Sequence, residues 1–132
     1  MKISATLKNQ MNVHSITVQT NDNAQEVHIA SKSTGFGSSV NGGELLMLAL
    51  ATCFCNDIYR EAKKKNINVS GVEVVVTGQF GAEGEAGKNF QYKAKVESDA
   101  PLAVIEELIV HTDKVAEIQN TLRSGIGIRL NM

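Results

Sequence analysis

The stretch Gly42–Asn66, GGELLMLALATCFCNDIYREAKKKN, decides the fold of this 132-residue chain. Its first half, from Leu45 to Cys55, is apolar at every position except Thr52. A helix on a protein surface keeps a polar stripe, and a helix that crosses a bilayer needs about 20 apolar residues. The stretch therefore predicts a helix that is buried on most of its circumference and ends near Asn66.

Composition and charge place the chain among ordinary globular proteins. It is 42% hydrophobic and 20% charged, so we expect a single domain over residues 1–132. The formal net charge is −1, and the one basic run, Lys63–Lys65, is interpreted as a solvated helix end favoured by the helix dipole. Nucleic acid binding relies on a concentrated positive surface, so we expect no nucleic acid partner.

The N-terminus and the cysteines bear on location. Met1–Gln10 alternates instead of forming an apolar block, so we expect no signal peptide and no membrane partner. Cys53 and Cys55 point about 200° apart on a helix and cannot bridge each other. The pair is therefore not a disulfide framework, and we expect a reducing, cytoplasmic location.

Alternating apolar and polar residues predict six strands. The cluster Asn21–Asn23 predicts a hairpin turn, and a turn centred on Gly84 would set Val76 opposite Tyr92. Residues 31–43, with four glycines and four serines, are predicted to form a surface loop. The predicted strands cover residues 2–8, 14–20, 25–29, 72–80, 90–97 and 126–130.

A second helical pattern follows these strands. Pro101 marks its first turn, with Asp99 or Ala100 as the cap. The pattern continues to Gly125, as one helix or as two. The predicted apolar stripe is Leu102, Ile105, Leu108 and Ile109, and the residues expected to face water are Glu106, Glu107 and Asp113.

The order of elements predicts an α+β domain with an antiparallel sheet. That order is β-β-β-α-β-β-α-(α)-β, with strands and helices partly segregated. A single sheet covers one side of a helix, yet residues 45–55 are apolar all round. We therefore infer a partner subunit, and hence a homodimer whose central helices lie near the two-fold axis.

Cys53 is the first candidate for chemistry. A nucleophilic cysteine must be a thiolate, but Cys53 lies more than two turns into the helix, where the dipole no longer acts. The charge of Asp57 would disfavour a thiolate, and Arg60 lies about 10 Å along the helix axis. From the residues alone, a packing role for Cys53 stays open beside a nucleophilic one.

The other candidate residues have ordinary interpretations. Cys55 is interpreted as a packing residue, and Glu44 as a helix-start carboxylate beside the positive end of the dipole. Glu44 lies about 13 Å from Cys53 along one helix, so any partnership would be across the dimer. His14 and His28 would face each other in the first hairpin, but two histidines without a third ligand make a poor metal site. We expect neither a metal nor a cofactor.

Two segments of the chain resemble a known family. Gly43–Cys53, GELLMLALATC, resembles the helix motif of the OsmC/Ohr family of thiol-dependent hydroperoxide reductases. Thr112–Leu122, TDKVAEIQNTL, resembles the family's second-cysteine segment, and Asp57 stands four residues after Cys53 as in the OsmC-like branch. Element order and length match over nearly the whole chain.

The resemblance implies an intertwined homodimer in which antiparallel sheets wrap around two buried central helices, with the active site at the interface. In active members the first cysteine attacks the peroxide as a thiolate and becomes a sulfenic acid. The second cysteine resolves it as a disulfide, while an arginine and a glutamate polarise the first. Carried onto this chain, Cys53 takes the attacking position, and Glu44 and Asp57 complete the candidate catalytic set.

The chain departs from the family pattern where the second step would occur. The second-cysteine position is Ala116, the following proline is Glu117, and residues 1–59 contain no arginine. Two hypotheses follow. The first is a peroxidase that reduces organic hydroperoxides through Cys53, with an external thiol as reductant. The second is a non-enzymatic dimer whose degenerate site binds a small apolar ligand at the interface. A purely structural or stress-induced dimer remains as a third interpretation.

Overall fold

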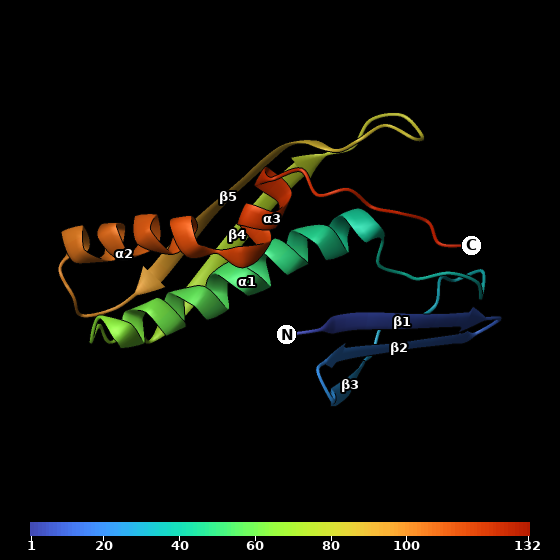
Figure 1. Ribbon diagram of the computed structural model, residues 1–132, viewed down its shortest axis with the longest axis horizontal. Coiled ribbons are helices and arrows are strands. Elements are labelled where there is room, and N and C mark those ends of the chain that lie inside the picture. The colour runs from blue at the N-terminus through green and yellow to red at the C-terminus, as the bar shows by residue number, and fades with distance from the viewer. The chain divides into compact units, whose positions relative to one another are not determined.

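The computed structural model describes residues 1–132. It divides into two compact units, Met1–Leu45 and Leu46–Met132, and the expected single domain stays a prediction. The first unit contains three strands, and the second contains most of a long helix, a strand hairpin and two shorter helices (Figure 1). The elements are β1 (Ile3–Gln10), β2 (Val13–Thr20), β3 (Asn23–Val27), α1 (Gly42–Lys64), β4 (Gly71–Gln79), β5 (Lys88–Glu97), α2 (Leu102–Val115) and α3 (Glu117–Arg123).

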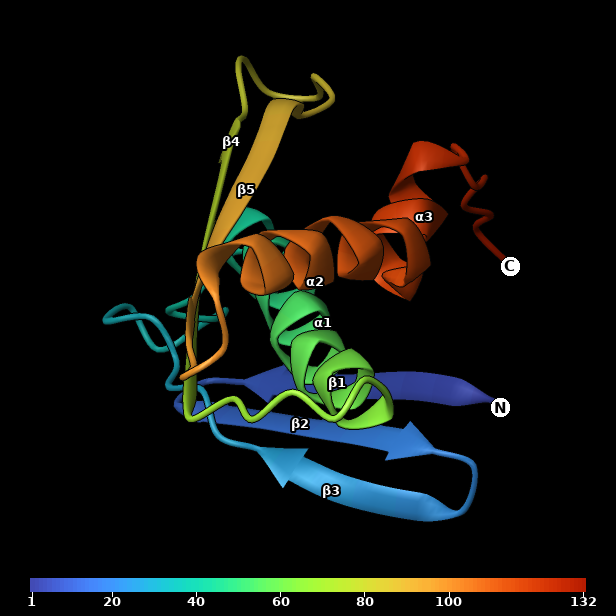
Figure 2. The same cartoon turned by 90° about the vertical axis from the view of Figure 1, so that its left-hand side faces the viewer.

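The first unit is built on an antiparallel sheet in the order β1-β2-β3, visible in Figure 2. Asn12 and Asn21 adopt φ angles of 57° and 51° in its two turns. Asparagine tolerates this left-handed conformation, so the predicted turn at Asn21 is confirmed. The register sets Leu7 opposite Ile16 and Ile16 opposite Val27. The apolar residues of the three strands therefore share one face, as alternation predicted.

The histidines of this unit do not face each other, which corrects the sequence expectation. Strand β3 ends at Val27 and does not reach His28. His14 lies opposite Asn9 of β1 instead, and the Asn9 amide is 3.0 Å from the ring nitrogen Nδ1. His28 is exposed and lies 3.9 Å from the Glu26 carboxylate.

The sheet of the first unit has no hydrophobic core of its own. No residue of β1, β2 or β3 is buried, and the side chains of Ile3 and Leu7 are 68% and 56% exposed. An antiparallel sheet normally packs its apolar face against another layer. The apolar face of this sheet thus has no covering layer within the first unit.

Helix α1 ends close to the predicted position. Asn66 follows it with a φ of 56°, its N–H donates to the Lys63 carbonyl at 3.2 Å, and the Ile67 N–H donates to the Ala62 carbonyl at 2.9 Å. These two bonds form a Schellman motif, in which a left-handed residue closes the helix.

In the second unit, β4 and β5 form an antiparallel hairpin with the predicted register. Val76 lies opposite Tyr92, and Gly84 in the connecting loop has a φ of 84° that glycine adopts without strain. A register shift between Thr77 and Gln79 interrupts the ladder. The apolar faces of the two strands coincide, as predicted from the turn at Gly84.

The core of the second unit lies between this hairpin and the helices. Figures 1 and 2 show α1 and α2 on the same face of the hairpin. Phe54, Ile58 and Leu108 are at most 1% exposed, and the Phe54 ring meets Tyr92 edge-on at 4.8 Å. Burying each such side chain contributes about 1.5–3 kcal/mol, so this cluster holds the two helices on the hairpin.

The pattern after Pro101 forms two helices. Ala116 is fully buried and has an extended ψ of 110°, which separates α2 from α3. Pro101 itself occupies the N-cap position of α2, without a side-chain cap. The predicted cap at Asp99 or Ala100 is therefore wrong, because the helix starts one residue later than expected.

Two residues of α2 differ from their predicted faces. Leu102 is 73% exposed, because as the first residue of α2 it lies outside the core cluster. Asp113 is half-buried and accepts hydrogen bonds from Tyr92 and Arg123. Asp113 therefore serves an internal polar contact and does not simply face water.

One further prediction is wrong for the single chain. Residues Ile126–Leu130 form no strand, because alternation needs a neighbouring strand to bond with, and Ile128 is fully exposed. On α1 the side chain of Leu48 is 59% exposed, and the inferred homodimer that would cover it stays a prediction. The observed architecture is α+β, with two antiparallel sheets and three helices. None of the helices has both the length and the apolarity of a membrane span.

Candidate functional site

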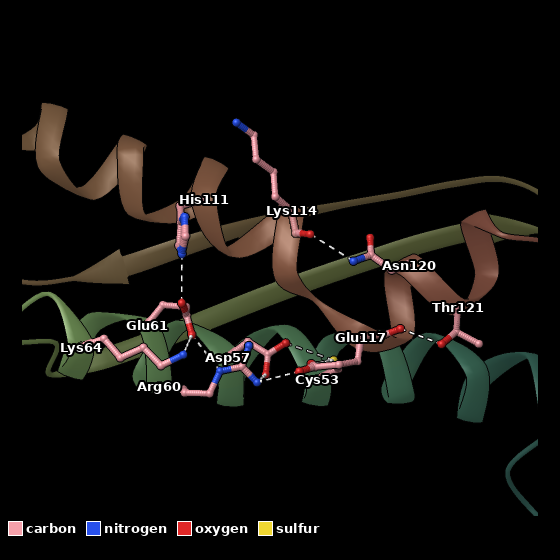
Figure 3. A network of polar contacts seen from close by, with 10 residues as sticks. All are labelled: Cys53, Asp57, Arg60, Glu61, Lys64, His111, Lys114, Glu117, Asn120 and Thr121. Carbon is pink, nitrogen blue, oxygen red and sulfur yellow. Dashed lines mark hydrogen bonds and ion pairs between the residues drawn. The ribbon is translucent and has the colours of Figure 1, made fainter.

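Cys53 lies where α1 meets the start of α3 (Figure 3). Its thiol donates a hydrogen bond to Asp57 Oδ2 at 3.3 Å, and its sulfur lies 4.0 Å from Glu117 Oε2. The spacing of four residues stacks Cys53 and Asp57 on one face of α1. Cys53 is half-buried, and Asp57 is only 5% exposed.

The break at Ala116 brings the first turn of α3 to this sulfur. The backbone N–H of Ile118, one of the first N–H groups of α3 that have no partner within the helix, faces the thiol closely enough to lower the pKa of Cys53. The segment that resembles the family's second-cysteine region therefore does lie against Cys53. It presents a carboxylate, from Glu117, and a backbone N–H.

Arg60 links the carboxylates around Cys53. Its Nη1 lies 3.0 Å from Asp57 Oδ1 and 2.9 Å from Glu117 Oε1, and its Nε donates to Glu61 Oε2 at 2.8 Å. Although Arg60 stands well along the axis from Cys53, its long side chain contacts Asp57. Two carboxylates, those of Asp57 and Glu117, therefore lie between the guanidinium and the sulfur.

Glu61 is a second buried carboxylate of this network, at 4% exposure. Besides Arg60, it pairs with Lys64 at 3.0 Å and with His111 Nε2 at 2.9 Å (Figure 3). These partners, Arg60 foremost, lower the pKa of Glu61 to about 2. A buried charge is tolerated only when it is paired in this way.

The local electrostatics favour a neutral thiol. Burial raises the pKa of Cys53, and the hydrogen bond and charge of Asp57 and the charge of Glu117 raise it further, whereas the Ile118 N–H lowers it. Burial also raises the pKa of Asp57, against the lowering effects of Cys53 and Arg60. Asp57 thus disfavours the thiolate form of Cys53, as the sequence predicted.

The same side chains offer donor atoms to a cation. Cys53, Asp57 and Glu117 each supply one atom, and these atoms lie within 4.8 Å of one another. Thiolate and carboxylate donors suit Zn²⁺. Arg60 already pairs with both carboxylates, so a metal ion would have to displace it.

Glu44 is not among the contacts of Cys53. Its carboxylate accepts from the Asn41 N–H at 3.1 Å, while its own N–H donates to Asn41 Oδ1 at 2.8 Å. This reciprocal pair is a capping box, which confirms the helix-start interpretation of Glu44. Cys55 is half-buried and carries a free thiol.

Sequence reasoning missed the roles of Glu61, His111 and Glu117 in this network. The i,i+3 spacings of Asp57 with Arg60 and of Glu61 with its lysine are local signals for ion pairs. The contacts of His111 and Glu117 join residues 50 and 57 positions apart in the chain. No local pattern encodes them, because they depend on how α2 and α3 pack on α1.

A family model described as OsmC-like protein matches residues 35–131. None of the curated proteins compared with the chain matches it.

Solved structures share the fold at low sequence identity. An OsmC-like protein from Mycoplasma pneumoniae is 22% identical with a TM-score of 0.64, over 94% of this chain and 87% of that one. An organic hydroperoxide resistance protein from Elizabethkingia anophelis is 19% identical with a TM-score of 0.63, over 98% and 94%. The organic hydroperoxide resistance protein OhrB of Bacillus subtilis is 16% identical with a TM-score of 0.58, over 98% and 96%.

Proposed function

Because the chain belongs to the OsmC-like protein family, we propose that it is a single-cysteine peroxidase that reduces organic hydroperoxides. The observation that carries the proposal is the hydrogen bond from the Cys53 thiol to Asp57 at 3.3 Å. A buried carboxylate with a raised pKa is suited to accept a proton and to return it. The likeness to hydroperoxide resistance proteins supports the choice of peroxide as substrate.

The chemical step uses that contact. Asp57 accepts the thiol proton while the Cys53 sulfur attacks the terminal oxygen of the hydroperoxide. The O–O bond breaks, sulfur takes the terminal OH and becomes a sulfenic acid, and the alkoxide receives the proton from Asp57 as it leaves as an alcohol. Arg60 acts as a positioning residue, since its ion pairs hold Asp57 and Glu117 in place.

Regeneration requires an external thiol. Ala116 stands at the position of the family's second cysteine, and Cys55 points away from Cys53 on the same helix. A first external thiol condenses with the sulfenic acid, which releases water and forms a mixed disulfide. A second external thiol then attacks the external sulfur of this mixed disulfide. The two external thiols leave as a disulfide, and the released Cys53 thiolate takes up the proton of the second thiol.

A homodimer is part of the proposal. Three surfaces of the single chain are apolar and open: the sheet face that carries Leu7, the side of α1 that carries Leu48, and the tail from Ile126 to Leu130. Exposed apolar surface of this extent marks an interaction site. Size-exclusion chromatography with light scattering should give twice the chain mass at micromolar concentration, and a folded monomer there would contradict the dimer.

Mass spectrometry tests the enzymatic step. After one equivalent of cumene hydroperoxide, the Cys55→Ser protein should gain one oxygen at Cys53, trapped as a dimedone adduct. The Cys53→Ser protein is the matched control and should gain no dimedone adduct. If Cys53 is oxidised no faster than in the urea-unfolded chain, the peroxidase proposal fails.

Substitution of Asp57 tests the proton path. Asp57→Asn removes the proton acceptor, so the rate of oxidation by cumene hydroperoxide should fall about 10²–10⁴-fold, which is the usual contribution of general acid–base catalysis. Alkylation of Cys53 by iodoacetamide should instead become faster, because a negative neighbour is gone. If both rates rise together, Asp57 carries no proton in the reaction.

We include Glu44 in the proposed active site, as a carboxylate that the partner subunit supplies to Cys53. Glu44→Gln retains the capping box, since glutamine serves there as well as glutamate, but removes the charge. It should lower peroxide reactivity with little change in stability. Asn41→Ala is the matched control, because it removes one half of the cap and keeps Glu44. Unchanged reactivity in Glu44→Gln would confine Glu44 to the helix start.

The second candidate function is binding of a small apolar ligand at the interface of such a dimer, without chemistry. The raised pKa of Cys53, caused mainly by burial, favours it. Fatty acids should then raise the melting temperature of the Cys53→Ser protein as much as that of the wild type, as followed by thermal shift measurements. No shift with any acyl chain, together with bare dimer in native mass spectrometry, would contradict this function.

A further inference from the structure

Helix α3 carries groups that face the Cys53 thiol, yet little of α3 is buried. It has seven residues, and Gln119 is its one buried side chain. Its N-cap residue, Ala116, makes no side-chain cap hydrogen bond. Isolated helices shorter than about 12–15 residues are marginal in water. The position of α3 therefore depends on contacts with the neighbouring elements.

The first half of α3 is attached to α1. The Glu117 carboxylate lies 2.9 Å from Arg60 Nη1, and the Gln119 amide donates to the Leu50 carbonyl at 3.0 Å. The Glu117 side chain is 63% exposed, and exposed ion pairs contribute little. The contact of Glu117 with the Cys53 sulfur therefore needs support from the rest of α3.

That support comes from Asp113 of α2, at the other end of α3. Arg123 is the last residue of α3, and its Nη2 lies 2.6 Å from Asp113 Oδ1. Its Nη1 donates to the backbone carbonyl of Asp113 at 3.1 Å. The hydroxyl of Tyr92, in β5, donates to the same carboxylate oxygen. Asp113 thus joins three elements, and we call Tyr92, Asp113 and Arg123 the clasp.

The clasp is anchored in the core and carries charge. The Tyr92 ring packs edge-on against Phe54, which is fully buried. Burial alone would raise the pKa of Asp113, but the hydrogen bonds from Tyr92 and Arg123 bring it below its ordinary value. The carboxylate is therefore ionised at neutral pH. Hydrogen bonds to an ionised acceptor are about twice as strong as those between neutral groups, so the clasp gives α3 a firm attachment.

Asp113 acts on the thiol from a distance, since its hydrogen bonds go to Tyr92 and Arg123 and not to Cys53. A helix of seven residues is about 10 Å long, so an attachment at Arg123 restrains the turn that holds Glu117. We propose that Asp113 is a positioning residue for Cys53, which through the clasp keeps the first turn of α3 against the thiol. Its bearing on catalysis rests on the proposed function, but its effect on the thiol can be measured without a peroxide.

Alkylation of Cys53 by iodoacetamide, in a Cys55→Ser background, tests the proposal. Asp113→Ala opens the clasp, so the thiol loses cover and the charge of Glu117, both of which raise the pKa of Cys53. The Ile118 N–H, which lowers it, is also lost, but burial has the largest effect. The pH profile should move to lower pH, with alkylation near neutral pH about threefold faster, as a shift of about half a pKa unit gives. An unmoved profile, or a move to higher pH, in a variant shown to be folded by circular dichroism would overturn the proposal.

Hydrogen exchange shows whether the effect passes through α3. The Asn120 N–H donates to the Ala116 carbonyl at 2.9 Å, and the Ser124 N–H donates to the Asn120 carbonyl at 3.0 Å. Both amides should exchange faster in Asp113→Ala, because α3 opens more often, whereas the amide of Ile58 in the core should keep its rate. If the α3 amides keep their protection, the clasp does not hold the helix and the proposal is refuted.

Two further variants separate positioning from a loss of stability. Arg123→Ala should shift the alkylation profile as Asp113→Ala does, and the double variant should add little, because both changes break the same clasp. Ile67→Ala is the matched control, since Ile67 packs against the core and belongs neither to α3 nor to the clasp. Its profile should match that of the Cys55→Ser protein. Fully additive shifts in the double variant, or an equal shift in Ile67→Ala, would contradict the role of Asp113.

This proposal and the peroxidase proposal can fail separately. Alkylation reports on the thiol of Cys53 whether or not a hydroperoxide oxidises it. A shifted profile in Asp113→Ala would support the positioning role even if cumene hydroperoxide left Cys53 unchanged. Oxidation of Cys53 at the same rate and with the same pH profile in wild type and Asp113→Ala would support the peroxidase and refute the positioning role.

Discussion

The two halves of α1 within the second unit show opposite relations between sequence and burial. In the first, the apolar side chain of Leu48 is 59% exposed. In the second, the charged side chains of Asp57 and Glu61 are 5% and 4% exposed. The difference lies in the neighbours: the charged half packs under α2 and α3, which supply ionic partners, while much of the apolar half lacks a covering element. Hydrophobicity alone therefore indicates which surfaces need cover, but not which surfaces have it.

The largest expected effect is on the free energy of unfolding. It is seen by comparing a core residue in the charged half of α1 with an exposed residue in the apolar half. Ile58→Ala should lower the free energy of unfolding by about 2–5 kcal/mol, because it leaves a cavity in the core. Leu48→Ala should change the unfolding of the isolated chain by about 0.5 kcal/mol or less. Urea denaturation of the monomeric chain, with the monomer checked by light scattering, compares the two. Similar losses for both variants would mean that the two halves do not differ.

The next largest effect comes from removing an ionic partner from the charged half of α1. Arg60→Gln leaves Asp57 buried beside Glu117 without its cation, and should cost about 1–3 kcal/mol of unfolding free energy. Lys64→Gln is the matched control, because Lys64 is 64% exposed and a surface pair contributes about 0–1 kcal/mol. Thermal denaturation in low salt measures both. An equal cost would indicate that burial does not strengthen these pairs.

The pH dependence of stability tests whether the ion pairs of Glu61 also stabilise the fold. Its pKa is about 2 in the folded chain against an ordinary value of 4.5. A depressed pKa stabilises the fold above the ordinary value, and that stabilisation is lost as pH falls from about 4.5 to about 2. Glu61→Gln should therefore flatten the decline of stability over this range. An identical slope in wild type and variant would show that the Glu61 pairs contribute nothing.

The smallest effect concerns the Cys53 thiol. Glu117→Gln should lower the pKa of Cys53, since Glu117 is one of the charges that raise it. The pH dependence of iodoacetamide alkylation, in a Cys55→Ser background, should shift toward lower pH in this variant. Glu106→Gln, on the exposed face of α2, is the control and should leave the alkylation profile unchanged. A shift to higher pH in Glu117→Gln would contradict the electrostatic description of the site.

Much of the fold was predictable because its signals are local. The register of β4 and β5 followed from alternation and the turn at Gly84, and the end of α1 followed from Asn66. The strand predicted at Ile126–Leu130 failed because a strand needs a bonding neighbour, which the single chain does not supply there.

The candidate site was predictable only in part. Cys53 and Asp57 lie on one helix, so their contact follows from helical spacing. Glu117 reaches them across a break at Ala116, and His111 reaches Glu61 from another helix. Such contacts depend on tertiary packing, which spacing along one element does not encode.

The extended backbone at Ala116 places the first turn of α3, with the Glu117 carboxylate, beside the Cys53 thiol. The charge of Glu117 raises the pKa of Cys53, and the backbone N–H of Ile118 lowers it. If α2 continued unbroken into α3, we expect that both groups would point away from the sulfur. We therefore expect mutations that alter the main-chain conformation at this one buried alanine to change the pKa of Cys53, with every ionisable residue left in place.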